Sequence, residues 1–311
     1  MAYQDPCPPS PPVNTKFKLE CVIVCAHYDD FLRETLPHNK QMFDRIVVVT
    51  SPDDKRTQKL CEFHHIECIP THALGVLEGA FRKGAGINVG LNRLDKDGWV
   101  LHLDADIWLP PQTRSLLQKM DLDKSMLYGI DRFIVENFES WRGFVENPKL
   151  QQEAGSWVHT NAFRMGTRVM HGEGYIPIGF FQLWFPSVSG IQTYPAGHTS
   201  AAREDGRFAL QWPRSKRHMI PDIIGYHLES ERCAMGMNWN GRKTKRFGMC
   251  PSDEPEESLA SPLEDQPDPE IPPLPPLPST SPLRNKRARW IFIGIVGALA
   301  VAAGIALLVK K

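Results

Sequence analysis

The sequence predicts an α/β fold in which a mostly parallel sheet carries helices on both faces. Short runs rich in Val and Ile recur along the N-terminal half, at 19–26, 45–50, 66–70 and 99–103. The segments between them, for example 31–43 and 57–64, are long enough for crossover helices. Strands that alternate with helices are typical of parallel sheets, and ligands of such sheets bind beyond the carboxyl ends of the strands.

Composition bounds the class of protein. The chain has 311 residues, of which 41% are hydrophobic, so it can bury a sizeable core. Its 36 basic residues balance 36 acidic ones, which argues against a general binder of polyanions. The 7 cysteines are odd in number and scattered, a pattern that suits buried thiols in a reducing compartment. We expect a disordered tail over 1–16 and a folded domain over 17–249.

The C-terminal region changes character twice. Residues 250–289 form a Pro-rich, acidic segment with a basic end, which predicts an extended linker. Residues 290–309 are uncharged and apolar, and this length predicts a transmembrane helix, the alternative being a buried core helix. Four basic residues precede this run and two follow it, at Arg284, Lys286, Arg287, Arg289, Lys310 and Lys311. Without a signal-peptide pattern at the N-terminus, we expect a single-pass C-terminal anchor with the domain facing the cytoplasm.

Two features of this region suggest protein partners. Small residues recur at four-residue spacing in the apolar run, at Gly294 with Ala298 and Ala300 with Gly304, which suits pairing of two anchors in a homodimer. The Pro-rich run 271–282 suits docking of an SH3-like domain.

The fourth strand run ends in two carboxylates, Asp104 and Asp106. Residues i and i+2 of a strand point to the same side, so we expect these side chains to converge. Two convergent buried carboxylates are costly unless a cation lies between them, and Mn²⁺ or Mg²⁺ prefers such oxygen ligands. The alternative is a pair of solvated residues at the end of a strand.

Polar residues also follow the earlier strand runs. His27 and Asp29 come after the first, Asp53 and Asp54 come after the second, and the Gly-rich stretch 82–90 precedes the fourth. That stretch matches neither G-x-G-x-x-G nor the Walker A loop, which disfavours a Rossmann dinucleotide site and a P-loop. Its glycines alternatively open and pack a helix.

The order of four segments carries a resemblance. CVIVCAHYDDFLRETL, RIVVVTSPDD, FRKGAGINVGLN and LHLDADIWLPP follow one another between Cys21 and Pro111. This order resembles the nucleotide-sugar half of a GT-A fold glycosyltransferase of the family-2-like group, over about 18–111 and more weakly to about 246. The resemblance implies a GT-A type domain with a nucleotide-sugar half over 17–111 and an acceptor half over 112–249.

The resemblance also implies roles for individual residues. Asp104 would lie near the donor ribose or the metal, and Asp106 would bind Mn²⁺ or Mg²⁺ that bridges the donor diphosphate. Lys83 lies where many family members contact the nucleotide. Residues near the nucleobase and ribose would include His27, Asp29, Asp53 and Asp54.

The second half would supply the acceptor side. By resemblance to an acidic motif at a helix start, Asp205 is the first choice of general base and Glu204 the second; the alternative is an ordinary helix cap. His227 ends an apolar run and would be a third metal ligand, or else a core histidine. Arg242, in a basic stretch, would close over the diphosphate; the alternatives are contact with an anionic membrane or a solvated domain end.

These observations predict a membrane-anchored, metal-dependent glycosyltransferase that uses a nucleoside diphosphate sugar. The acceptor is left open among glycans, lipids, proteins and modified bases. One alternative is a nucleotidyltransferase of similar α/β fold. Another is a non-catalytic, membrane-tethered adaptor that binds a nucleotide sugar.

Overall fold

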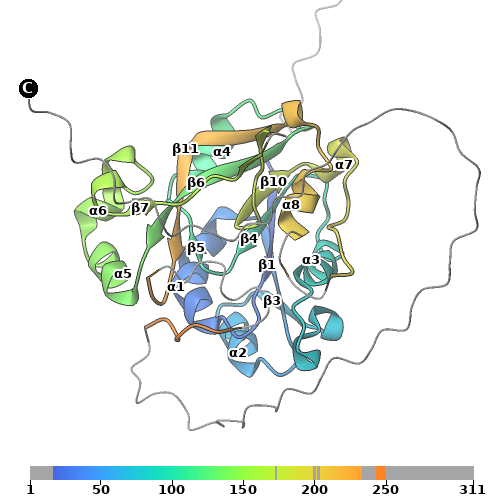
Figure 1. Ribbon diagram of the computed structural model, residues 1–311, viewed down its shortest axis with the longest axis horizontal. Coiled ribbons are helices and arrows are strands. Elements are labelled where there is room, and N and C mark those ends of the chain that lie inside the picture. The colour runs from blue at the N-terminus through green and yellow to red at the C-terminus, as the bar shows by residue number, and fades with distance from the viewer. Residues whose placement is uncertain (1–16, 172–173, 199–200, 202–203, 233–241, 249–311) are drawn as a thin grey trace, which may run out of the picture. The chain divides into compact units, whose positions relative to one another are not determined.

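The computed structural model describes residues 17–171, 174–198, 201, 204–232 and 242–248 (Figure 1). The predicted tail 1–16, the linker 250–289 and the transmembrane helix 290–309 lie outside the described residues. Within the described part, no helix combines the length and apolar character needed to cross a bilayer. The chain divides into two units, 1–256 and 257–311, and the description below concerns the first.

The elements of this unit alternate as the sequence predicts in the N-terminal half. The strands are β1 (Leu19–Val24), β2 (Arg45–Thr50), β3 (Glu67–Pro70), β4 (Trp99–Asp104), β5 (Ile107–Trp108), β6 (Leu127–Val135), β7 (Arg164–Met165), β8 (Met170–His171), β9 (Gly174–Tyr175), β10 (Phe181–Trp184) and β11 (Arg217–Leu228). The α-helices are α1 (Asp29–Asn39), α2 (Lys55–Phe63), α3 (Lys83–Leu91), α4 (Thr113–Lys119), α5 (Phe138–Val145), α6 (Pro148–Gln152), α7 (Pro186–Ser189) and α8 (Glu204–Ala209). Short 3₁₀ helices are η1 (Lys40–Met42), η2 (His72–Leu74), η3 (Val76–Glu78), η4 (Trp157–Asn161) and η5 (Arg214–Lys216).

The main sheet has the strand order β3-β2-β1-β4-β10-β6-β11-β5, with β7 beside β6. The first four strands are parallel, as predicted. The expectation of a mostly parallel sheet is wrong for the rest, because β10 runs antiparallel to both of its neighbours and β5 runs antiparallel to β11. Strands β6 and β11 are parallel to each other. The sheet is therefore mixed, with a parallel half that carries the predicted strand ends.

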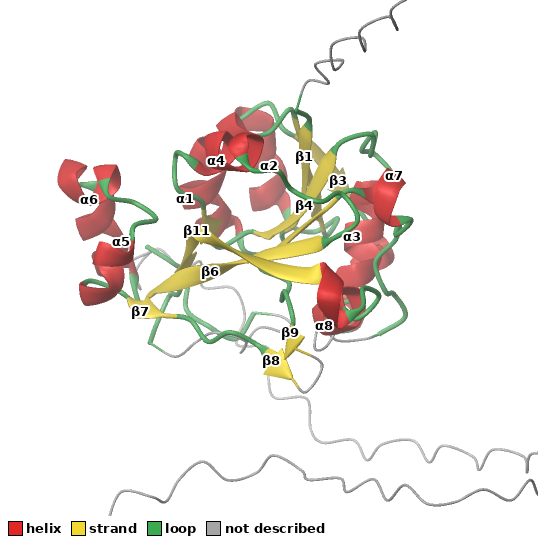
Figure 2. Cartoon of the chain, turned by 90° about the horizontal axis from the view of Figure 1, so that it is seen from above, coloured by secondary structure: helices red, strands yellow, loops and turns green. Residues whose placement is uncertain are grey.

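Helices cover both faces of the sheet, as predicted (Figure 2). Successive side chains of a strand point to opposite faces, so β1 divides its apolar residues between two cores. Cys21 and Ile23 pack in the core that includes α1, α2 and α4. Val22 and Val24 pack in the core that includes α3 and α8. Burying one such side chain stabilises the fold by about 1.5–3 kcal/mol, and every residue of β1 is buried.

Glycines let helix α3 approach the sheet closely. A Cβ at Gly90 would lie 2.3 Å from Cγ2 of Val22 on β1. A Cβ at Gly84 would lie 1.9 Å from the carbonyl oxygen of Pro195. No side chain fits in either place, so the glycine-rich stretch packs a helix. This packing brings Lys83, the first residue of α3, to the carboxyl end of the parallel strands.

The segment 242–248 returns to the start of α1. The guanidinium of Arg242 donates to both carboxylate oxygens of Asp30, at 2.6 and 2.7 Å. Arg246 pairs with Asp29 at 2.5 Å, and the ring of Phe247 stacks on Phe31 with centroids 4.8 Å apart. Both aspartates are buried, so these cations offset charges that would otherwise be costly inside the fold.

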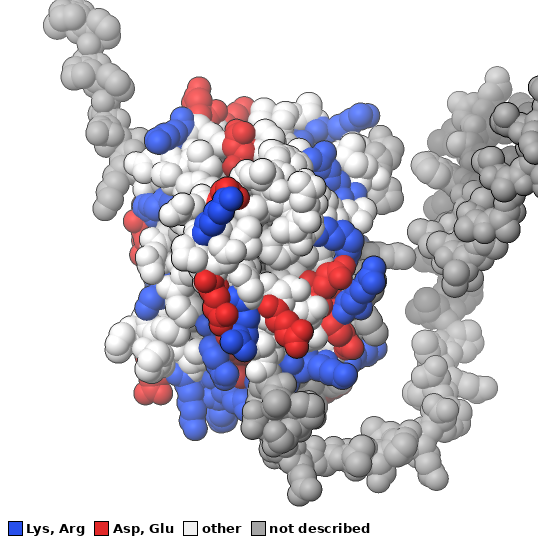
Figure 3. Space-filling model, turned by 90° about the vertical axis from the view of Figure 1, so that its left-hand side faces the viewer, with Lys and Arg blue, Asp and Glu red and all other residues white. Residues whose placement is uncertain are grey.

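Acidic and basic side chains are interspersed on the face drawn in Figure 3. Ion pairs near the surface include Arg142 of α5 with Glu146, at 3.0 Å, and Arg164 of β7 with Glu136, at 3.2 Å. Mixed charge of this kind matches the balanced composition and offers a polyanion no continuous basic surface on this face.

Candidate active site

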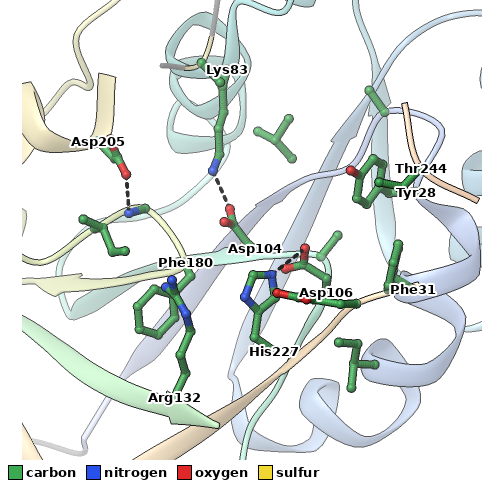
Figure 4. A pocket seen from close by; sticks show the side chains of 18 of the residues that line it. Tyr28, Phe31, Lys83, Asp104, Asp106, Arg132, Phe180, Asp205, His227 and Thr244 are labelled. Atoms are coloured by element: carbon green, nitrogen blue, oxygen red, sulfur yellow. Dashed lines mark hydrogen bonds and ion pairs between the residues drawn. The ribbon is translucent and has the colours of Figure 1, made fainter. Parts of the chain in front are cut away.

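A cavity of about 360 Å³ opens at the carboxyl ends of β1 and β4 (Figure 4). The ends of these parallel strands form its floor, and the starts of α3 and α8 and the end of β11 contribute further side chains. Its polar and charged lining includes Tyr28, Lys83, Asp104, Asp106, Arg132, Thr167, Asp205, His227, Glu229, Ser230 and Thr244. The cavity thus lies where an α/β sheet is expected to bind its ligand.

Asp104 and Asp106 both line the cavity, as the sequence predicts. Their convergence has a different cause from the one expected. Asp104 is the last residue of β4, whereas Asp106 lies in a turn before β5, so the strand does not continue through the pair. Strand β5 then pairs with β11, which brings His227 opposite Ile107.

Lys83 provides the positive charge nearest to Asp104. Its Nζ atom lies 2.5 Å from Oδ1 of Asp104, and the two side chains are 15% and 28% exposed. Burial disfavours the charged ammonium, but the carboxylates of Asp104, Asp205 and Asp106 outweigh this effect and hold the pKa of Lys83 above its ordinary value. The pKa of Asp104 is also raised, because burial outweighs the attraction of Lys83. The ammonium of Lys83 therefore stays charged beside the end of β4.

Asp106 has a different neighbour, His227. Nε2 of His227 lies 3.2 Å from Oδ2 of Asp106. Burial opposes ionisation of Asp106, but the nearby His227, Lys83 and Arg132 prevail and hold its pKa below the ordinary value. Its other oxygen, Oδ1, is buried without a hydrogen-bond partner in the described structure, and so is Nδ1 of His227. The predicted proximity of these two residues is present, while their role as metal ligands stays a prediction.

The donor atoms of this cluster suit Mn²⁺ or Mg²⁺. Carboxylate oxygens and an imidazole nitrogen are accepted ligands of these ions, and the buried Oδ1 of Asp106 has a lone pair to offer. Among the residues that the structure describes, however, no group of three His, Cys, Asp or Glu side chains is gathered as a ready-made metal centre. Each aspartate instead faces its own partner, Lys83 for Asp104 and His227 for Asp106.

The adjacent acids Glu204 and Asp205 point to different places. Asp205 lines the cavity and its Oδ2 accepts a hydrogen bond of 2.8 Å from the backbone N–H of Gly179. Glu204 is fully buried and its Oε2 accepts a hydrogen bond of 2.7 Å from the backbone N–H of Gly84, in the first turn of α3. Burial raises the pKa of Glu204. Of the two predicted bases, only Asp205 therefore reaches the cavity.

Arg132 lines the cavity and was not singled out from the sequence. Its guanidinium lies 4.3 Å from the centre of the Phe180 ring, in a cation–π contact. Burial lowers its pKa, although the carboxylates of Asp106 and Asp104 oppose this shift. The sequence LYGIDRFIV does contain a sign that Arg132 is unusual. Two charged residues interrupt this apolar strand, and all nine of its residues are buried. The other one, Asp131, pairs with Arg168.

The residues predicted to contact the nucleobase and ribose lie after β1 and β2. Nε2 of His27 lies 3.1 Å from Oδ2 of Asp53, and both side chains are about two-fifths exposed. Asp54 accepts hydrogen bonds from the backbone N–H groups of His27 and Thr57, at 2.6 and 3.1 Å, and so caps α2. His27 and Asp53 remain accessible to a ligand, whereas Asp54 is occupied in holding the two strand ends together.

Asp29 and Arg242, also predicted to bind the donor, are engaged inside the fold. Asp29 is buried and pairs with Arg246, and Arg242 pairs with Asp30. Arg242 also lies over the rings of Tyr28 and Phe31, at 5.0 and 5.5 Å. Tyr28, Phe31 and Thr244 line the cavity, so this pairing shapes its wall.

No protein-family model and no curated protein matches the sequence. Among solved structures, a mannosyl-3-phosphoglycerate synthase from Rubrobacter xylanophilus matches 70% of this chain and 66% of its own, at 15% identity and a TM-score of 0.44. A glucosyl-3-phosphoglycerate synthase from Mycobacterium tuberculosis, solved with Mn²⁺, uridine diphosphate and phosphoglyceric acid, matches 68% of this chain and 71% of its own, at 12% identity and a TM-score of 0.41. The chain thus spans just under two thirds of the first structure. Likeness at this level carries no conclusion about what this chain binds.

Proposed function

We propose that this chain is a metal-dependent glycosyltransferase that moves a sugar from a nucleoside diphosphate to an acceptor hydroxyl. The supporting observation is that Asp104, Asp106 and Asp205 share one cavity with Lys83 at the carboxyl ends of parallel strands. The reaction brings the two phosphates and the sugar of the donor together with a hydroxyl of the acceptor. The cavity offers carboxylate ligands for a metal ion, the ammonium of Lys83 and a carboxylate base.

Each side chain has a role that follows from its neighbours. Asp104, Asp106 and His227 would hold the divalent ion, which when bound supplies positive charge where the departing diphosphate develops negative charge. Lys83 adds a second positive charge on the same side of the cavity. His27 and Asp53, accessible at the ends of β1 and β2, would bind the nucleoside.

Asp205 acts as the base for the acceptor. As the acceptor oxygen bonds to the anomeric carbon, its proton passes to Asp205, and the bond from that carbon to the phosphate oxygen breaks with its electron pair on the nucleoside diphosphate. The N–H of Gly179 fixes Oδ2 of Asp205, and carboxylate lone pairs remain for the incoming proton.

The test is binding and turnover with a panel of nucleoside diphosphate sugars, measured on the full-length chain with and without Mn²⁺. We expect one donor to raise the melting temperature in a Mn²⁺-dependent way and to be converted to the free nucleoside diphosphate. Asp106→Ala should lose this effect, while Asp97→Ala, which removes an exposed acid, should keep it. Release of pyrophosphate from a nucleoside triphosphate would favour a nucleotidyltransferase instead, and stabilisation without turnover would favour an adaptor.

Tethering to a membrane is a further proposal that rests on the sequence of 290–309 alone. We propose with it that the domain faces the cytoplasm and that two anchors pair in a homodimer. We also propose that an SH3-like domain binds 271–282. Fractionation of cells that express the full chain or a chain ending at 249 tests the anchor, because only the full chain should sediment with membranes.

A further inference from the structure

Lys83 pairs with one of the two carboxylate oxygens of Asp104, where a metal ion would otherwise bind. Its Nζ atom lies 2.5 Å from Oδ1 of Asp104, and the Lys83 side chain is only 15% exposed. The ammonium of Lys83 also lies near Asp205, because both side chains lie against Gly179. A Cβ built on Gly179 would lie 3.3 Å from Nζ of Lys83 and 2.9 Å from Cβ of Asp205. Figure 4 shows Lys83 reaching from α3 toward Asp104, with Asp106 beside His227 beyond it.

The two aspartates are consequently held by different partners. Asp106 faces His227 at 3.2 Å, and Asp104 faces Lys83. The described residues hold no gathered set of three metal ligands, although the carboxylates share a cavity. Nζ pairs with Oδ1, so a divalent ion that binds both aspartates through this oxygen has to take the place of the ammonium at Asp104.

We propose that Lys83 is a resident cation that competes with the divalent metal for Asp104 when no donor is bound, and moves to the diphosphate when the metal arrives. This inference rests on the proposed function. A lysine suits the exchange because its ammonium is a compact charge on a flexible four-carbon stem with rotatable donors. Without metal and donor, Lys83 keeps the carboxylate of Asp104 paired. When the metal displaces it, the ammonium lies beside the negatively charged phosphates of the donor.

Competition predicts an effect that a simple donor contact does not. If Lys83 only contacted the donor, Lys83→Met would leave the affinity for metal alone unchanged. If Lys83 competes, the same substitution removes the competitor, and Mn²⁺ alone should bind about ten-fold more tightly in the absence of donor. Lys83→Arg keeps the positive charge and should bind Mn²⁺ as the wild type does.

The experiment is titration of the full-length chain in detergent with Mn²⁺ alone at fixed pH, following the free ion by electron paramagnetic resonance. Lys18→Met is the matched control, because Lys18 pairs with Asp95 and Asp97 at 2.7 and 2.5 Å, next to the start of β1 and far from its carboxyl end. This control should not alter the affinity. Lys83→Gln repeats the measurement if the Met variant does not fold, and Asp106→Ala shows which binding belongs to the cavity.

The outcomes separate this inference from the proposed function. Tighter Mn²⁺ binding in Lys83→Met or Lys83→Gln, lost again when Asp106→Ala is added, supports the competition. Equal or weaker binding in these variants, with wild-type binding intact, overturns the competition and leaves the metal-dependent enzyme standing. Absence of Mn²⁺ binding in the wild type and in every Lys83 variant overturns the competition, and the proposed function is then decided by the Mn²⁺-dependent donor binding described above.

Discussion

Glu204 accepts a hydrogen bond of 2.7 Å from the backbone N–H of Gly84, a residue 120 positions earlier in the chain. The contact joins the first turn of α3 to the first turn of α8. Each partner is the immediate neighbour of a cavity residue, Lys83 in one helix and Asp205 in the other. One buried carboxyl group thereby sets the spacing between the candidate cation and the candidate base.

Replacing this carboxyl group should change how stability depends on pH. Burial raises the pKa of Glu204 above its ordinary value of 4.5, so the folded state holds the proton more tightly than the unfolded state. The stabilisation from the protonated form is complete below pH 4.5 and is lost as the pH rises through the folded-state pKa. The side chain that Glu204→Gln introduces does not titrate. The free energy of unfolding of this variant minus that of the wild type should therefore increase as the pH rises from 4.5 through the folded-state pKa of Glu204.

Urea unfolding of both proteins from below pH 4.5 to neutrality measures this difference. Groups that titrate in both proteins cancel. A difference that stays constant with pH would show that Glu204 is not perturbed in the folded state.

Asp205→Asn should abolish the base while preserving the cavity. The amide keeps an oxygen for the N–H of Gly179 but cannot take the acceptor proton, so kcat should fall roughly 10²–10⁴-fold. Donor affinity, measured by calorimetry, should change only a few-fold. Asp95→Asn, an exposed acid paired with Lys18, serves as the control and should leave kcat unchanged. Full kcat in Asp205→Asn would remove Asp205 from the mechanism.

Asp30→Asn should destabilise the domain. Asp30 is inaccessible and accepts two hydrogen bonds from Arg242, whose side chain is 13% exposed. Removing one partner of a buried pair leaves the other charge uncompensated and costs about 3–5 kcal/mol. Chemical unfolding measures this loss, and the matched change Asp97→Asn, in an exposed pair, should cost less than about 1 kcal/mol. If Arg242→Met is combined with Asp30→Asn, the total loss should be smaller than the sum, because the buried charge has then gone as well.

Two glycine substitutions should have opposite effects. The Cβ of Gly84→Ala would meet the carbonyl oxygen of Pro195 at 1.9 Å, so α3 has to shift, at a cost of about 1–3 kcal/mol. Gly143, in α5, has open space around its Cβ position, and Gly143→Ala should stabilise the helix by about 0.5–1 kcal/mol. The melting temperatures of both variants and of the wild type measure these effects. If the two substitutions changed the melting temperature equally, α3 would be free to move. Lys83 is next to Gly84, so the Ala variant should also bind the donor less tightly.

The sequence was sufficient for the parallel half of the sheet because those strands are local runs of buried Val and Ile. It was insufficient for β10, where Phe181 pairs with Leu103, and for β5, where Ile107 pairs with His227. Both pairings join residues far apart in the chain, and alternation of apolar residues does not specify a partner. The turn at Ala105–Asp106 is not predicted, because Ile107 continues the apolar pattern after it.

The same distinction applies to the site. The local pattern was enough to predict five residues of the cavity, because they lie at or next to strand ends or helix starts: Asp104, Asp106, Lys83, Asp205 and His227. Arg242 was chosen for its charge alone, and its partner Asp30 lies 212 positions away. Arg132 is not predicted from the sequence, because two adjacent charged residues within an apolar strand are also typical of an exposed position.

The pairing of segment 242–248 with the start of α1 has a consequence for synthesis of the protein. The carboxylates of Asp29 and Asp30 are among the first described residues to leave the ribosome, and Arg242, Arg246 and Phe247 are among the last. Until these last residues emerge, the nascent chain has two acids without their final counter-ions at the point where β1 leads into α1. The nucleotide side of the cavity is therefore completed only after residue 247 has left the ribosome, and a chain that terminates before this residue lacks the final contacts of both aspartates.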